Sequence, residues 1–238
     1  ILSKLLAHDP EEIGSFMASP VEIETEAVYE VDTYGSSMAP FYTVLALWVG
    51  GLILVAIIHT KVEMEPSFKN AKPHQQFFGR YITFFLIAQI QALITVLGDL
   101  YFIGIECAHP FLFWLAASCS SFVFGFLMYA LTAAFGNIGE GLAIIIMVIQ
   151  VAGAGCTFPI ETLPKVFQTF YRFQPFKYAM GAMKEAVAGM YQDDYWKDLA
   201  ILLSYTIISL IVGLVLAVPF RKLNHILEES KEKSGVML

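Results

Sequence analysis

Four polar side chains interrupt long apolar stretches of this sequence, and they are the residues best placed to do chemistry inside a membrane. They are Gln89, Gln91, Asp99 and Gln150. A polar or ionisable side chain is costly in hydrocarbon, so each one is a functional hypothesis by default. The sequence predicts that they line a transport path or make polar contacts between helices. For Asp99, near the outer end of its stretch, an interfacial or paired carboxylate is the simpler alternative.

Gln89 and Gln91 are two residues apart, so on a helix they point to nearly opposite sides. At most one of them can line a path comfortably. The other is expected to hold neighbouring helices together, a contact of about 1 kcal/mol.

Motifs of nucleotide hydrolysis, metal binding and nucleophilic catalysis are absent from the sequence. It contains no G-x-x-x-x-G-K-[ST], H-E-x-x-H, G-x-S-x-G or C-x-x-C. The three cysteines, Cys107, Cys119 and Cys156, fit no metal spacing, and we interpret them as structural. We therefore predict no catalytic residue, no metal and no cofactor. The net charge of −7, without a basic stripe, argues against a nucleic-acid partner.

The elements that must position these residues are membrane helices. The chain is 57% hydrophobic and only 15% charged, against about 25% charged in soluble domains. A helix needs about 20 apolar residues to cross about 30 Å of hydrocarbon. Five stretches qualify, at 41–58, 81–105, 111–135, 141–160 and 199–220. They predict an all-α integral membrane protein with five transmembrane helices, and its partner is the lipid bilayer.

Small residues and prolines end the fourth stretch and mark a candidate outer gate. A run of small residues lets helix backbones approach closely, and proline stops a helix. The candidate gate comprises Gly153, Gly155, Phe158, Pro159 and Pro164.

Two short helices are predicted after this gate, within 161–198. Pro164 begins the first, Pro175 is expected to break it, and the second runs from about Tyr178 to Met190. Neither is long enough to span. We interpret the segment as a broken, re-entrant hairpin on the outer side, with an ordinary amphipathic external helix as the alternative.

Basic residues predict the orientation. Lys and Arg gather in the loop 59–80 and in the tail 221–238, which places both, and the C-terminus, in the cytoplasm. Segment 161–198 is the exception, because it is predicted outside yet holds five basic residues. The candidate cytoplasmic coupling loop comprises Glu63, Glu65, Phe77, Phe78 and Arg80. Anchoring of its aromatic residues at the membrane surface is an equal alternative.

The segment 1–37 is predicted to be the membrane-proximal end of an external domain, followed by a transmembrane domain at 38–220. Apolar and acidic residues alternate between Val21 and Asp32, which is typical of a half-buried strand. An acidic linker is the alternative. Because the sequence begins at Ile1, we expect an upstream region of the same protein.

Several motifs together resemble the C-terminal membrane domain of the YhgE/Pip (phage infection protein) family. The resemblance covers Phe16 to about Asp198. Among its motifs are Leu97-Gly-Asp-Leu, Phe135-Gly-Asn-Ile-Gly, Gln150-Val-Ala-Gly-Ala-Gly and Thr157-Phe-Pro-Ile-Glu-Thr-Leu-Pro. Two positions depart from the family pattern: Cys156 replaces an expected glycine and Lys184 an expected arginine.

The resemblance implies a bacterial, multi-pass cell-membrane protein with an ABC-2 type transporter fold. It implies a permease-like subunit of an export system, a homodimer, energised by a separate ATPase subunit. The alternative is a non-transporting membrane anchor of a cell-surface phage receptor or secretion-system component.

Overall fold

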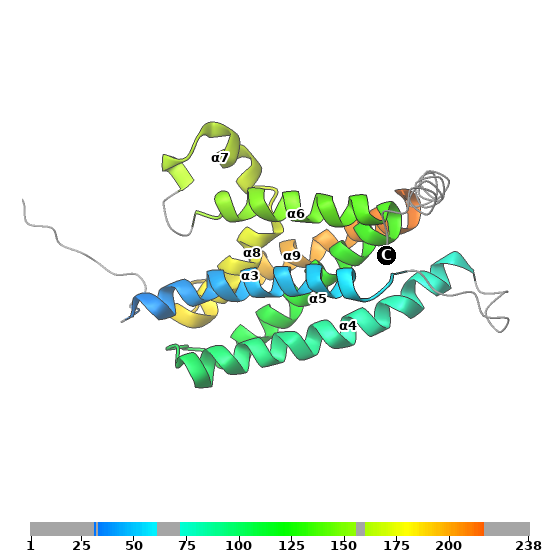
Figure 1. Ribbon diagram of the computed structural model, residues 1–238. Coiled ribbons are helices and arrows are strands. Elements are labelled where there is room, and N and C mark those ends of the chain that lie inside the picture. The colour runs from blue at the N-terminus through cyan, green and yellow to red at the C-terminus, as the bar shows by residue number, and fades with distance from the viewer. Residues whose placement is uncertain (1–30, 32, 61–71, 156–159, 217–238) are drawn as a thin grey trace, which may run out of the picture. The chain divides into compact units, whose positions relative to one another are not determined.

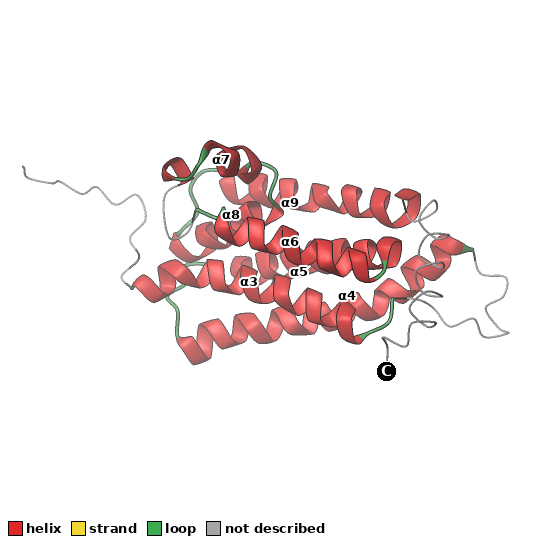
Figure 2. Ribbon diagram, turned by 45° about the horizontal axis from the view of Figure 1, so that its top comes forward, coloured by secondary structure: helices red, strands yellow, loops and turns green. Residues whose placement is uncertain are grey.

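The computed structural model describes residues 31, 33–60, 72–155 and 160–216, and in these ranges every regular element is a helix (Figure 2). Several predicted features lie outside the described residues. These are the strand between Val21 and Asp32, the loop residues Glu63 and Glu65, the gate residues Phe158 and Pro159, and the tail 221–238.

Four helices in the described part of the chain are long and apolar enough to cross a membrane. They are α3 (Tyr34–Ile57), α4 (Pro73–Leu97) continued by the π-helix η2 (Gly98–Ile103), α5 (Pro110–Phe135), and α9 (Asp194–Leu210) continued by the π-helix η4 (Ile211–Leu216). Their backbone polar groups bond within the helix, which is what hydrocarbon requires. The all-α membrane fold is therefore confirmed.

Helix α6 (Asn137–Ala152) is shorter than the predicted fourth span, 141–160. Its 16 residues rise about 24 Å, less than the hydrocarbon thickness of about 30 Å. The helix ends at the run of small residues, where Gly155 takes a positive φ of 63°. Because only four helices reach spanning length in the described residues, the count of five stays a prediction.

The chain between α6 and α9 forms three short elements. These are the 3₁₀ turn η3 (Ile160–Thr162), α7 (Lys165–Tyr171) and α8 (Pro175–Ala188). Helix α7 ends at Tyr171, four residues before Pro175, and Pro175 opens α8 as its first residue, a position that needs no N–H donor.

Helix α5 lies at the centre and packs against α3, α4, α6, α8 and α9 (Figure 1). Most of its side chains from Ser120 onward are buried. An aromatic cluster joins it to α4: the ring centroids of Tyr81 and Phe126 are 4.5 Å apart, and those of Phe77 and Tyr129 are 4.9 Å apart. This packing fixes the helices that carry the polar residues.

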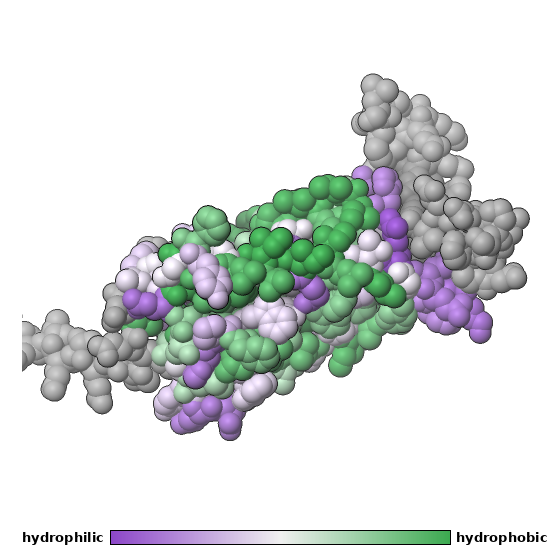
Figure 3. All heavy atoms as spheres, turned by 90° about the horizontal axis from the view of Figure 1, so that it is seen from below, coloured by the Kyte–Doolittle hydropathy of each residue, from purple (hydrophilic) through white to green (hydrophobic). Residues whose placement is uncertain are grey.

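The starts of α3, α5 and α9 meet at one end, which we call the outer end after the predicted topology. The Glu106 N–H donates to the Ser36 hydroxyl at 3.0 Å, and the Tyr195 hydroxyl donates to the Leu112 carbonyl at 2.8 Å. Exposed aromatic residues surround this end, as in the interfacial belts of membrane proteins. They include Tyr34, Tyr42, Tyr101, Phe102, Phe111 and Trp196. On the face seen in Figure 3, apolar residues cover most of the middle and hydrophilic residues gather toward the ends.

Candidate functional site

The two amides of α4 contact different neighbouring helices. The Gln89 side-chain N–H donates to the Ser118 carbonyl of α5 at 3.2 Å, and the Ser118 hydroxyl donates to the Gln89 side-chain oxygen. The Gln91 side-chain N–H donates to the Ala46 carbonyl of α3 at 3.1 Å. Gly50 makes room for this contact, because a Cβ there would lie 1.7 Å from Gln91 Nε2. Both glutamines therefore tie helices together.

Asp99 lies in the π-helical turn η2 and is buried against α3. The Thr43 hydroxyl, itself buried, lies 2.5 Å from Asp99 Oδ2 and 2.9 Å from the Ala39 carbonyl. This arrangement matches the paired carboxylate given above as the alternative for Asp99. Sequence reasoning missed Thr43. Its only signal is a hydroxyl group within the uncharged stretch 41–58.

Gln150, the last buried side chain of α6, connects this helix to α8 through Phe176, which lies 26 residues further along the chain. Its Oε1 accepts a hydrogen bond from the Phe176 N–H at 3.1 Å. Pro175 has no N–H, so the Phe176 amide is the first donor at the start of α8, and the helix itself offers it no acceptor. Gln150 thus caps α8 from another helix.

Gln174, immediately before α8, completes this joint, and sequence reasoning missed it. Its side-chain N–H lies 3.5 Å from the Ile149 carbonyl of α6. Thus Gln150 of α6 reaches the start of α8, and Gln174 before α8 reaches the end of α6. Two buried amide atoms of the joint, Gln150 Nε2 and Gln174 Oε1, have no hydrogen-bond partner among the described residues. The available signal was Pro175, because proline is favoured at the first position of a helix and so marks Gln174 as the residue before it. We call Gln150, Gln174 and the Phe176 amide the α6–α8 joint.

Of the described members of the predicted gate, Gly153 lies next to this joint. Gly153 is buried, and a Cβ on it would lie 3.3 Å from Gln174 Nε2 and 3.2 Å from the Ile149 carbonyl oxygen. Gly155 follows with its positive φ. Pro164 is exposed and stands at the N-cap of α7, one residue before the first helical position.

The described members of the predicted coupling loop differ in exposure. Phe77 is buried and packs against Phe126, and its ring leaves no space for a side chain at Gly213. The Arg80 guanidinium donates to the His59 carbonyl from Nε at 2.9 Å and from a terminal nitrogen at 2.6 Å. Phe78 is 44% exposed. Of these three, Phe78 is the side chain available to a partner.

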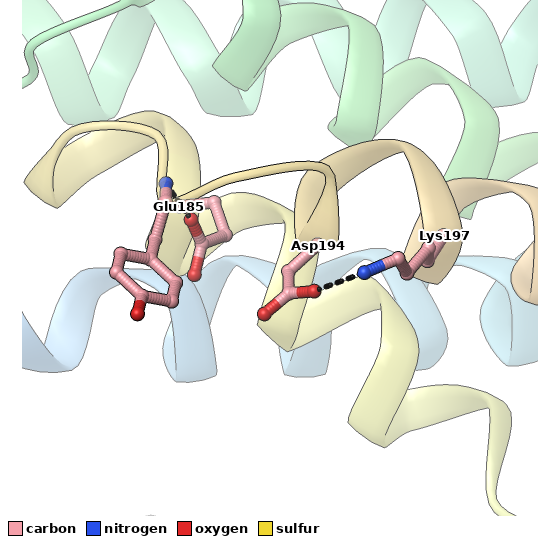
Figure 4. A network of polar contacts seen from close by, with 4 residues as sticks. Glu185, Asp194 and Lys197 are labelled. Carbon is pink, nitrogen blue, oxygen red and sulfur yellow. Dashed lines mark hydrogen bonds and ion pairs between the residues drawn. The ribbon is translucent and has the colours of Figure 1, made fainter.

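A small polar network fixes the outer ends of α8 and α9 (Figure 4). The Tyr191 N–H donates to Glu185 Oε2 at 2.7 Å, and Lys197 Nζ lies 2.9 Å from Asp194 Oδ1. The Lys197–Asp194 pair is exposed, so solvent screening leaves it little influence on stability. We assign this network to the turn between the helices and give it no chemical role. Among the described residues, no three His, Cys, Asp or Glu side chains form a group able to hold a metal.

The family of the chain follows from comparison with known proteins. The family described as "ABC-2 family transporter protein" matches residues 2–217. The chain therefore belongs to the ABC-2 family of transporter proteins, and it is a multi-pass membrane protein. This membership confirms the predicted ABC-2 type fold.

A protein of Bacillus subtilis (strain 168), described as "Uncharacterized protein YhgE", is similar to most of the chain. The two are 26% identical over 206 residues, which is 87% of this chain and 26% of the relative. The resemblance to YhgE-like membrane domains is confirmed. The chain spans about a quarter of the length of this relative. No solved structure matches the chain.

Proposed function

We propose that this chain is the membrane path of an ABC-2 type export system, working as a homodimer and energised by a separate ATPase. Family membership supports the transport role. These 238 residues contain no phosphate-binding loop, and we assign nucleotide hydrolysis to a separate subunit.

The observation that carries the proposal is the interruption of the membrane helix at the end of α6. The helix stops at Ala152, and the chain returns as α8, whose inner face is buried against α3, α5 and α9. Non-helical backbone at membrane depth is tolerated where protein covers it or where it lines an aqueous path. Interrupted helices of this kind form the substrate sites of many transporters. The hairpin from Gly153 to Met190 is thus a suitable outer gate.

The α6–α8 joint supports a movable gate. Leaving a buried polar atom unpaired costs about 1–3 kcal/mol, and the joint leaves two such atoms without a described partner. A rearrangement that paired them would recover part of this cost. The closed joint therefore need not be much more stable than an open one, which is what a gate requires.

The ATPase part of the proposal is tested by purification of the tagged full-length protein from native membranes after mild crosslinking. We expect an ATPase subunit to copurify, and Phe78→Ala to reduce its recovery. Phe102→Ala is the matched control, because Phe102 is an exposed phenylalanine at the opposite end of the same span, α4 continued by η2. Absence of any ATPase, together with unchanged export when the gene is deleted, would leave the anchor function as the better account.

The gate part is tested by hydrogen–deuterium exchange of Gln150→Leu in lipid nanodiscs. We expect faster exchange at the Phe176 amide and the first turn of α8, with α5 unchanged, because the acceptor of this amide is lost. The control is Gln91→Leu, the same substitution at a contact between α3 and α4. Equal exchange at α8 in both variants would argue against a gate at this joint.

A further inference from the structure

Helix α7 lies within the proposed gate hairpin and carries an exposed apolar stripe to which the gate gives no role. Val166, Phe170 and Phe173 are spaced i, i+4 and i+7, so they lie along one side of α7 and the turn that follows it. Their exposed fractions are 63%, 55% and 71%. Apolar side chains in a continuous stripe of this kind mark an interaction surface.

The stripe is held in place by polar contacts at both ends of α7. The Gln168 side-chain N–H donates to the Leu163 carbonyl at 2.9 Å, which fixes the preceding turn. The Tyr178 hydroxyl donates to the Arg172 carbonyl at 2.7 Å. Lys177 Nζ lies 4.7 Å from the ring centre of Tyr171, close enough for a cation–π contact that joins α7 to α8. The helix is therefore presented in a defined orientation.

The long helices cover little of α7, which packs chiefly against η3 (Figure 1). A seven-residue helix is unstable in water by itself and needs an environment for its apolar side. The position of α7 suits a membrane surface. The rings of Phe41 and Phe176, 5.7 Å apart, place the start of α8 beside the outer part of α3, near the level of the exposed aromatic belt.

The charges next to the stripe indicate which surface it meets. Between residues 160 and 177 there are three basic side chains, Lys165, Arg172 and Lys177, and a single acidic one, Glu161, although the whole chain carries a net charge of −7. Lys165 and Arg172 are exposed and lie on one flank of the stripe. Apolar side chains flanked by cations are typical of helices that lie in the interface of an anionic bilayer.

We propose that α7 is a lipid-binding element whose apolar stripe lies in the outer boundary between headgroups and acyl chains. Lys165 and Arg172 bind the phosphates of anionic phospholipids. Long basic side chains reach the headgroup level while their aliphatic stems stay at the apolar boundary. This also explains why an outer segment carries so many basic residues against the usual bias. The proposal does not depend on transport.

The experiment places a nitroxide spin label on a full-length variant that lacks its native cysteines. Labels at Phe170→Cys, on the stripe, and at Lys165→Cys, on the basic flank, are compared in nanodiscs. We expect the label at 170 to be accessible to oxygen and protected from a water-soluble nickel chelate, and the label at 165 to show the reverse. A label at 170 exposed to nickel, or protected from both reagents by protein, would overturn the proposal.

The dependence on lipid charge is tested by measuring the depth of the same label at 170 in two kinds of nanodisc. One contains pure phosphatidylcholine, and the other contains three parts phosphatidylcholine to one part phosphatidylglycerol. We expect deeper burial of the label with phosphatidylglycerol, and loss of this difference in the Lys165→Gln/Arg172→Gln variant. Lys197→Gln is the control, since Lys197 is an exposed cation already paired with Asp194. A difference that persists without Lys165 and Arg172, or that is absent from the parent, would contradict binding through their charges.

Discussion

At the residue scale, the polar groups within these helices act as links between helices. Gln89 reaches α5, Gln91 reaches α3, and Asp99 reaches Thr43 of α3. Such contacts contribute about 0.6 kcal/mol on average in membrane proteins, but a buried group that loses its partner costs more. Removing one partner is therefore the informative change.

Thr43→Val is expected to destabilise the protein by about 1 kcal/mol, because it leaves the buried Asp99 carboxylate without the hydroxyl 2.5 Å away. Thermal unfolding in detergent measures the effect. The control is Thr95→Val. The Thr95 hydroxyl donates to the Gln91 carbonyl at 2.9 Å, as the Thr43 hydroxyl does to the Ala39 carbonyl, but no carboxylate among the described residues bonds to it. Equal shifts in the two variants would show that the contact with Asp99 contributes nothing.

Cys107 is expected to react with maleimide more slowly at pH 7 than a cysteine at the neighbouring exposed position, Ala108→Cys. Burial raises the pKa of the Cys107 thiol, although a backbone hydrogen bond from His109 lowers it in part. Maleimide reacts with the thiolate, and a raised pKa moves thiolate formation to higher pH. The difference between the two labelling rates should therefore become smaller as the pH rises. Labelling rates between pH 7 and pH 9, in a background without the other cysteines, measure it, and equal rates throughout would refute the assignment.

At the element scale, two junctions decide how α6 is placed. Gly136, with a φ of 59°, is the single residue between α5 and α6. Gly139 then packs on the backbone of α5, at a distance where no side chain fits. The other junction is the α6–α8 joint. The first junction is a tight turn, and the second is the joint at which we propose that the gate moves.

Gly139→Ala is expected to lower the melting temperature, with a cost of about 1–3 kcal/mol from overpacking. A Cβ at residue 139 would lie 2.2 Å from the Leu131 carbonyl oxygen, and backbone cannot move aside as a flexible side chain can. Gly141→Ala is the matched control in the same helix, because nothing lies within 4 Å of its Cβ position. It should be neutral or stabilising by up to about 1 kcal/mol. A Gly139→Ala variant as stable as Gly141→Ala would mean that the turn is looser than described.

At the scale of the whole molecule, α5 is the scaffold, and several irregular elements of the described residues lie toward the outer end. The π-helical turn with Asp99, the α6–α8 joint and α7 all lie toward the end marked by exposed aromatic residues. A permease whose outer gate opens beside the lipid headgroups would combine these features. The orientation of this end in the membrane follows from the distribution of basic residues and is open to a direct test.

Single cysteines introduced at Lys69, Lys231 and Ala108 test this orientation. We expect a membrane-impermeant thiol reagent to label Ala108→Cys on intact cells, and to label Lys69→Cys and Lys231→Cys only after the membrane is opened. The physical reason is the preference of basic segments for the cytoplasmic side. Labelling of Lys69→Cys and Lys231→Cys from opposite sides would rule out an even number of spans between them.

The sequence by itself determined the membrane class and the all-α fold, whereas helix bounds such as the start of α4 at Pro73 differ from the predicted spans. Uncharged stretches of about 20 residues have one stable arrangement in lipid, and proline and glycine act locally. Tertiary structure decided what the polar residues do. Thr43 meets Asp99 from 56 residues away, and Gln150 meets the Phe176 amide from 26 residues away. Such pairings depend on how helices rotate and pack against α5, which no local pattern specifies. The same holds for Phe77 and Phe78, adjacent in the chain, of which packing buries one and leaves the other exposed.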